Sequence, residues 1–117
     1  MNKNVVITGA SGFVGSHLAK HLADQGYKVY AIVNPDSKTS SRIEGYPGIN
    51  LVPCELQDIE RIRNLVPEDA DAFFHFAWAG VAPELRKSVV IQKDNVDMAL
   101  NAVRLAKELS VRKFVFP

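Results

Sequence analysis

Apolar residues along this chain form two kinds of segment that alternate from one end to the other. Short runs of consecutive apolar residues are separated by longer segments in which apolar positions recur every three or four residues. The first kind is typical of strands covered on both faces, and the second is typical of helices that bury one face. Strands that alternate with helices predict an α/β fold with a parallel sheet. The strands are expected at Asn4–Thr8, Lys28–Val33, Asn50–Pro53, Ala72–Ala77 and Lys113–Phe116.

The first helix is expected at Phe13–Gln25. Gly26 follows it, and glycine is common just beyond the end of a helix because it adopts a left-handed conformation there. Val14, Leu18 and Leu22 have the spacing of a stripe that faces the sheet.

Two further helices are expected, one at Ile59–Val66 with Asp58 as its N-cap, and a long one after Pro83 that is clearest at Asn95–Leu109. A loop with one helical turn is expected at Thr39–Gly48. The inward-facing residues are predicted as Ile59, Ile62, Leu65 and Val66 in one helix, and Val96, Ala99, Val103 and Ala106 in the other. This order of elements predicts one domain over residues 1–117, a doubly wound parallel sheet with strand order 3-2-1-4-5.

Glycines at positions 9, 12 and 15 lie between the first strand and the first helix. Gly9 can adopt a positive φ in a tight turn, Gly12 lets the backbone approach a diphosphate, and Gly15 lets the helix lie close to the strand. The free amides and the positive dipole end of the helix would then face the phosphates of a dinucleotide. The other interpretation of the same residues is a glycine-rich turn that binds no ligand.

The end of the second strand bears on the choice between NAD and NADP. An acidic residue there hydrogen-bonds a free ribose 2′-hydroxyl, whereas a cation accepts a 2′-phosphate. Val33 and Asn34 do neither. Asp36 favours NAD if the loop folds back, while Lys38 and Arg42 favour NADP. The residues therefore predict NAD or NADP and leave the choice open.

Composition narrows the class of protein further. The chain has 117 residues, of which 47% are hydrophobic and 23% charged, and its net charge of +1 gives no reason to expect nucleic acid or an anionic membrane as a partner. No apolar run has the length of a membrane span, and the first strand begins too early to leave room for a signal peptide. Cys54 is the only cysteine, so no intrachain disulfide can form, which fits the reducing cytoplasm. Because Cys54 follows the strand residues Leu51 and Val52, we interpret it as a buried residue. His17 and His21 lie one helical turn apart, but without a third ligand nearby they predict no metal site.

The motifs resemble those of the extended short-chain dehydrogenase/reductases, the NAD-dependent epimerase/dehydratase family. Residues 8–18 look like the family's TGxxGxxG turn, and Asp71–Trp78 looks like its fourth strand, where His-Phe-Ala-Trp replaces a common His-Leu-Ala-Ala. Asn95 looks like the Asn of an Asn-Val element in the next helix, and Val111–Phe116 looks like the fifth strand. The resemblance implies a Rossmann-type fold, incomplete after the fifth strand, because it covers only the first third to half of a full-length member.

The resemblance also implies a set of cofactor-binding residues. The pair after the third strand approaches adenine in the family, usually as Asp and an aliphatic residue, and here it is Glu55 and Leu56. The complete set implied for NAD or NADP is Gly9, Ser11, Gly12, Phe13, Val14, Gly15, Asn34, Glu55, Leu56, Phe76, Ala77, Trp78 and Asn95.

The family's catalytic residues have no counterpart here. Family members use a Ser or Thr beyond the fifth strand and a Tyr-x-x-x-Lys pair, in which the Lys stabilises the tyrosine's phenolate. Tyr27, Tyr30 and Tyr46 are not followed by Lys four residues later. We therefore assign no catalytic residue.

Three functional hypotheses follow. The first is the NAD(P)-binding portion of a nucleotide-sugar epimerase, dehydratase or reductase, inactive as the bare chain, whose full-length parent would take a nucleotide sugar. The second is a non-enzymatic NAD(P)-sensing or scaffold protein of the same fold, and the third is a structural domain with an empty turn. Phe114–Phe116 would lie at an open sheet edge, which predicts self-association.

Overall fold

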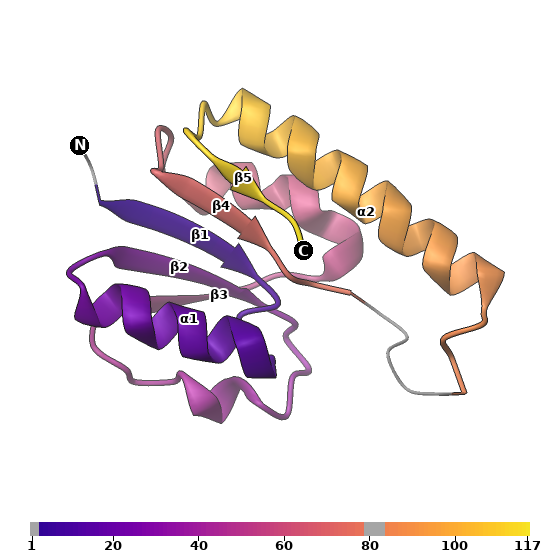
Figure 1. The fold of residues 1–117 in the computed structure, drawn as a ribbon, viewed down its shortest axis with the longest axis horizontal. Helices are drawn as coiled ribbons and strands as arrows, with labels where there is room; N and C mark the ends of the chain where they lie inside the picture. Colours follow the sequence, from indigo (N-terminus) through magenta and orange to yellow (C-terminus); the bar gives the residue numbers. More distant parts are fainter. Residues whose placement is uncertain (1–2, 79–83) are drawn as a thin grey trace.

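Five parallel strands form one sheet in the order β3-β2-β1-β4-β5, as the sequence predicts. The computed structural model describes residues 3–78 and 84–117, without the side chains of Leu56, Gln57 and Ile59. The strands are β1 (Asn4–Thr8), β2 (Lys28–Val33), β3 (Ile49–Pro53), β4 (Ala72–His75) and β5 (Phe114–Val115). The last two strands are shorter than expected, and all the arrows in Figure 1 point toward one edge of the sheet.

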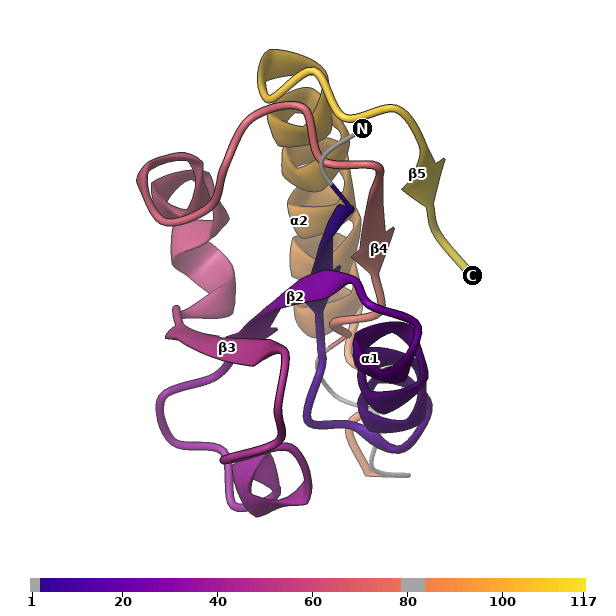
Figure 2. The ribbon, with the colours of Figure 1, turned by 90° about the vertical axis from the view of Figure 1, so that its left-hand side faces the viewer.

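Helical segments cover both faces of the sheet. The α-helix α1 (Phe13–Asp24) and the 3₁₀ turn η1 (Ser40–Arg42) lie on one face. The 3₁₀ segment η2 (Leu56–Asn64) and the α-helix α2 (Val89–Glu108) lie on the other, as Figure 2 shows. No helix in the described part of the chain combines the length and the hydropathy of a membrane-spanning segment.

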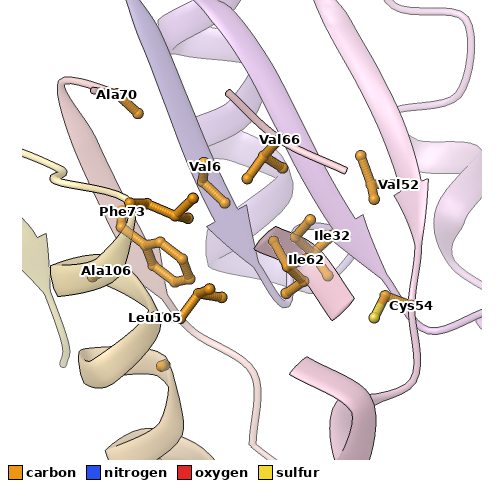
Figure 3. Packing of buried hydrophobic residues seen from close by; sticks show 12 residues of the cluster. Val6, Ile32, Val52, Cys54, Ile62, Val66, Ala70, Phe73, Leu105 and Ala106 are labelled. Atoms are coloured by element: carbon orange, nitrogen blue, oxygen red, sulfur yellow. The ribbon is translucent and has the colours of Figure 1, made fainter. Parts of the chain in front are cut away.

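Alternation along the strands divides the core into two clusters. Val5 and Ile7 of β1 face α1, whereas Val6 between them faces η2 and α2, because successive side chains of a strand point to opposite faces. Figure 3 shows the second cluster, in which one residue from each of β1 to β4 meets residues of η2 and α2. Its buried members are Val6, Ile32, Val52, Cys54, Ile62, Val66, Ala70, Phe73, Ala102, Leu105, Ala106 and Leu109.

The prediction that Val14 faces the sheet is wrong. Its side chain is 62% exposed, while Gly15, Ser16 and Ala19 are the buried residues of α1. The first turn of α1 lies so close to Gly9 and Ala10, just after β1, that only a glycine fits at position 15. Leu18 and Leu22, farther along the helix, pack against the core as expected.

The predicted buried stripe of α2 is also largely wrong. Val96 and Val103 are about half exposed, at 51% and 49%, and Ala106 is the one member of the predicted stripe that is fully buried. The buried residues of the helix are Asn95, Met98, Ala102, Leu105 and Ala106. The helix begins at Val89, after Pro83 as expected, where the hydroxyl of Ser88 accepts a hydrogen bond from the amide of Ile91.

The helix expected at 59–66 is instead the 3₁₀ segment η2. Asp58 lies inside it at a kink, with φ −102° and ψ 31°, and Glu55 stands at the N-cap position. Ile62 and Val66 are buried as predicted, but Leu65 is 45% exposed. The side chain of Ile59 lies outside the described residues.

Candidate functional site

The turn after β1 has no space for side chains at two of its three glycines. Gly9 has a φ of +67°, and a β-carbon on it would lie 2.7 Å from the backbone nitrogen of Ala77. A β-carbon on Gly15 would lie 2.3 Å from the carbonyl oxygen of Gly9. Gly12 is exposed, and the nearest atom to its β-carbon position is the same oxygen at 3.2 Å. Packing within the chain therefore fully accounts for a glycine at positions 9 and 15, but only in part for a glycine at position 12.

The first turn of α1 presents unpaired amides at its N-terminal end. Gly12 is the N-cap and has no side chain to bond them. Among the described residues, the amides of Phe13, Val14 and Gly15 have no hydrogen-bond acceptor. The first turn contains no acidic residue. Donors and a positive dipole end together favour an anion at this position.

A buried hydrogen-bond network joins the ends of β1 and β4 next to this turn. The Thr8 hydroxyl lies 2.7 Å from Nδ1 of His75 and accepts a hydrogen bond from the amide of Ala77 at 3.2 Å. The amide of Phe76 donates to the carbonyl oxygen of Thr8 at 3.2 Å. Both side chains of the pair are fully buried, and burial lowers the pKa of His75, so the imidazole is neutral near neutral pH.

A pocket of about 300 Å³ lies beyond this network. It is lined by His75, Phe76, Ala77, Trp78, Phe116 and Pro117. The Nε2 atom of His75 is buried and has no hydrogen-bond partner in the described part of the molecule. The pocket therefore brings together three predicted residues, Phe76, Ala77 and Trp78.

Asn95 is not among the described residues that line this pocket. Its side chain is fully buried and donates a hydrogen bond to Gln92, whose side-chain oxygen also accepts the indole N–H of Trp78. Asn95 thus contacts Trp78 through Gln92.

The loop after β2 returns to the glycine turn. The amide of Asp36 donates to the side-chain oxygen of Asn34 at 2.8 Å, and the hydroxyl of Ser37 lies 3.0 Å from that of Ser11. The guanidinium of Arg42, on η1, donates to the carbonyl oxygen of Ser11 at 3.1 Å. The predicted residue Ser11 therefore contacts the loop directly, whereas the side chain of Asn34 forms a hydrogen bond within the loop.

Glu55 follows β3 at the same edge of the sheet and is half-buried, whereas the side chain of its predicted partner Leu56 lies outside the described residues. Cys54 precedes it and is buried, as predicted. Its thiol donates to the carbonyl oxygens of Glu55 and Asp58, and burial raises the pKa of Cys54. Burial and a raised pKa both lower the fraction of reactive thiolate.

Most predicted residues gather at the carboxyl edge of the sheet, where the strand arrows of Figure 1 end and α1 begins. Sequence reasoning missed the Thr8–His75 pair and the contact of Arg42 with the turn. A signal for the pair was present, because each residue is a polar group at the end of an otherwise apolar strand. For Arg42 no signal existed, since nothing in the spacing of residues 34–42 shows how the loop folds. No cluster of metal-ligating side chains occurs among the residues that the structure describes.

The sheet order, the glycine turn and the strand-end pocket define a Rossmann-type α/β protein. A model of the NAD dependent epimerase/dehydratase family matches residues 5–117, and the chain belongs to this family.

Individual relatives fit this assignment. The chain is 33% identical over 108 residues to a UDP-N-acetyl-alpha-D-glucosaminuronate decarboxylase of Bacillus cytotoxicus, covering 91% of this chain and 33% of the relative. It is 27% identical over 119 residues to a UDP-glucose 4-epimerase of Schizosaccharomyces pombe, covering 96% of this chain and 34% of the relative. The chain thus spans about a third of the length of these curated relatives.

Solved structures show the same relationship. The UDP-glucose 4-epimerase of Stenotrophomonas maltophila, solved with bound NAD and formylated UDP-arabinopyranose, matches with a TM-score of 0.81 at 25% identity, over 97% of this chain and 36% of the other. The UDP-glucose 4-epimerase of Thermotoga maritima, solved with UDP-glucose, matches with a TM-score of 0.78 at 28% identity, over 97% and 37%.

Proposed function

We propose that this chain is the NAD- or NADP-binding part of a nucleotide-sugar epimerase, dehydratase or reductase. The observation that carries this proposal is the set of unpaired amides of Phe13, Val14 and Gly15 at the start of α1, beside the exposed Gly12, which has no side chain to cover them. These residues fit a dinucleotide, because its diphosphate needs donors and an approach without side chains. The presence of NAD or UDP-sugars in solved relatives supports the same assignment.

The proposed cofactor contacts divide into three groups along the sheet edge. Gly9, Ser11, Gly12, Phe13, Val14 and Gly15 bind the diphosphate, and Asn34, Glu55 and Leu56 bind the adenosine half. Phe76, Ala77 and Trp78 line the nicotinamide half, with Asn95 supporting Trp78 through Gln92.

The nicotinamide supplies hydride transfer when bound, and the residues of this chain bind and orient it. None of the tyrosines has the lysine partner needed for proton transfer at neutral pH. We therefore propose that the bare chain binds the cofactor without turning over a nucleotide sugar. The proposed compartment is the cytoplasm, in keeping with a single, buried cysteine.

A second candidate is a non-enzymatic NAD(P) sensor or scaffold of the same fold, which would bind the same dinucleotide at the glycine turn. The codons that follow Pro117 in the gene distinguish the two candidates. A downstream Tyr-x-x-x-Lys supports the enzyme, and its absence supports the sensor.

We also propose that the chain self-associates through an apolar surface on α2 and β5. A groove of about 300 Å³ there is lined by Trp78, Val96, Ala99, Leu100, Val103, Phe114 and Phe116. Exposed apolar surface of this kind favours association.

Isothermal titration calorimetry with NAD⁺, NADH, NADP⁺ and NADPH tests the proposed function directly. We expect saturable binding of at least one of them, and a rise in melting temperature, because a ligand at about a hundred times its Kd stabilises the folded state by about 2.7 kcal/mol. A folded sample whose melting temperature is unchanged by saturating amounts of every coenzyme would refute the proposal.

A further inference from the structure

The structure offers a specific answer to the choice between NAD and NADP. β2 ends at Val33, whose side chain is buried and uncharged, and the next residue, Asn34, uses its side-chain oxygen to hold the amide of Asp36. Neither residue supplies the acid or the cation that usually distinguishes a 2′-hydroxyl from a 2′-phosphate at this position. The distinguishing groups must therefore come from the loop that follows.

Arg42 is the cation that this loop brings to the glycine turn. Its Nη1 donates to the carbonyl oxygen of Ser11 at 3.1 Å, which leaves most of the donors of its guanidinium unused. Arg42 forms no ion pair with any carboxylate in the described ranges 3–78 and 84–117. An arginine anchored by one bond and lacking a counter-ion is suited to bind a phosphate.

Hydroxyl groups lie at the same place. The Ser11 and Ser37 hydroxyls are 3.0 Å apart, and the Ser37 hydroxyl lies 3.2 Å from that of Thr39. The amide of Thr39 donates to the Ser37 hydroxyl, which orients it. Hydroxyl groups can donate to phosphate oxygens, so this cluster adds donors beside Arg42.

The acidic residues of the loop do not occupy this position. Asp36 and Glu44 balance Lys38 and Arg42 in number, so the net charge of the loop decides nothing. Asp36 is exposed, and neither acidic side chain has a hydrogen bond or ion pair to the glycine turn among the described residues. Arg42, and neither of the two acidic residues, therefore contacts the glycine turn.

We propose that Arg42, with the hydroxyls of Ser11 and Ser37, forms a subsite for the 2′-phosphate of the adenosine ribose, so that this chain selects NADP(H) over NAD(H). The subsite rests on the proposed function, since it requires the adenosine half of a dinucleotide at the end of β2. The chemical class recognised is a phosphate monoester, which carries close to two negative charges at neutral pH.

The test is calorimetric titration of the chain with NADPH, NADH, 2′,5′-ADP and 5′-AMP. The last two nucleotides differ only in the 2′-phosphate, so their comparison isolates its recognition from that of the 5′-phosphate. We expect NADPH and 2′,5′-ADP each to bind about ten-fold or more tighter than the partner lacking the 2′-phosphate, which is the range of a charge-assisted hydrogen bond.

Two exposed variants report on the subsite without disturbing the core. Arg42→Gln is expected to lower NADPH affinity by about ten-fold while leaving NADH within about two-fold. Asn34→Asp keeps the oxygen that holds the amide of Asp36 but adds a negative charge, so it is expected to lower the NADPH to NADH affinity ratio. Arg112→Gln, at an exposed arginine before β5, is the matched control and is expected to leave the ratio unchanged.

Each failure has its own signature. Equal affinity for NADH and NADPH in the unmodified chain overturns the subsite while the proposed function stands. An equal loss of both coenzymes in Arg42→Gln also overturns it, because Arg42 would then act only by holding the Ser11 carbonyl. Binding of neither coenzyme refutes the proposed function, and the subsite with it.

Discussion

The hydroxyl of Thr8 lies 2.7 Å from Nδ1 of His75, and both side chains are fully buried. The hydroxyl accepts the amide of Ala77 and, with the imidazole in its Nε2–H tautomer, donates its own proton to Nδ1. The pair joins the carboxyl ends of β1 and β4 directly beside Gly9, so it holds the glycine turn against the strand that leads to the nicotinamide pocket.

Thr8→Val tests how much this link stabilises the fold. Valine has nearly the same shape as threonine, but it leaves the amide of Ala77 and Nδ1 of His75 without their buried partner. We expect the free energy of unfolding to fall by about 1–3 kcal/mol, measured by urea denaturation. Thr8→Ser keeps the hydroxyl and should lose less, and a Thr8→Val protein as stable as the original would contradict the assigned role.

Stability should also depend on pH through His75. Burial lowers the pKa of His75 in the folded state, so the unfolded chain binds the proton more readily. The stabilisation is present above the unfolded pKa of about 6.5 and is lost as the pH falls through that value toward the lower folded pKa. We therefore expect the free energy of unfolding to decrease between about pH 7.5 and about pH 5.

His75→Asn is the control for this titration. The side-chain oxygen of Asn can accept the Thr8 proton but does not titrate in this range. The variant should be less stable at neutral pH and should have a flatter dependence on pH. Since the exposed His17 and His21 remain in both proteins, identical slopes would show that His75 is not responsible.

The sequence was sufficient for the features that depend on local pattern. The strand order and the glycine turn follow from runs of apolar residues and from the positions of Gly9 and Gly15, which the structure shows to be sterically required. The spacing of apolar residues did not predict the buried face of a helix that has two apolar faces. In α2, Val96 and Val103 satisfy a helical stripe as well as Met98 and Leu105 do, and only packing against η2 and β4 decides which stripe is buried.

The remaining site features depend on contacts between residues distant in sequence. The Thr8–His75 bond joins residues 67 positions apart, and the Arg42 to Ser11 bond joins residues 31 positions apart. Polar residues at the ends of two apolar strands are a signal for the first bond, but neither spacing nor residue type predicts the second. The two bonds determine the link beside the turn and the proposed 2′-phosphate subsite.

Gly12 and Gly15 are expected to respond differently to an added side chain. Gly12 has φ −70° and ψ 175°, which any residue adopts, and its side-chain position is restricted only by the Gly9 oxygen at 3.2 Å. Gly12→Val should therefore cost about 1 kcal/mol or less in stability, yet lower coenzyme affinity by about ten-fold or more by blocking the diphosphate. Unchanged affinity in calorimetry would place the ligand elsewhere.

Gly15→Ala is the structural counterpart. Its β-carbon would lie 2.3 Å from the Gly9 oxygen, so the helix must shift, and we expect a loss of about 1–3 kcal/mol or more in the free energy of unfolding. An alanine variant as stable as the original would mean that α1 can move away from β1 at little cost.

The apolar surface of α2 and β5 leads to a prediction about oligomeric state. Leu100 is 60% exposed, and it lines the groove together with Val96, Val103 and Phe116. We expect the chain to form dimers or larger species at micromolar concentration in sedimentation velocity, because this surface is apolar and continuous.

Leu100→Lys should shift the population toward monomer, since a lysine charge would be desolvated in a contact formed by this groove. Leu65→Lys is the matched control, because Leu65 is 45% exposed just after η2 and does not line the groove. A clean monomer of the unmodified chain would remove the proposal of self-association. Dissociation by both variants alike would show that added charge, and not the α2 surface, controls the assembly.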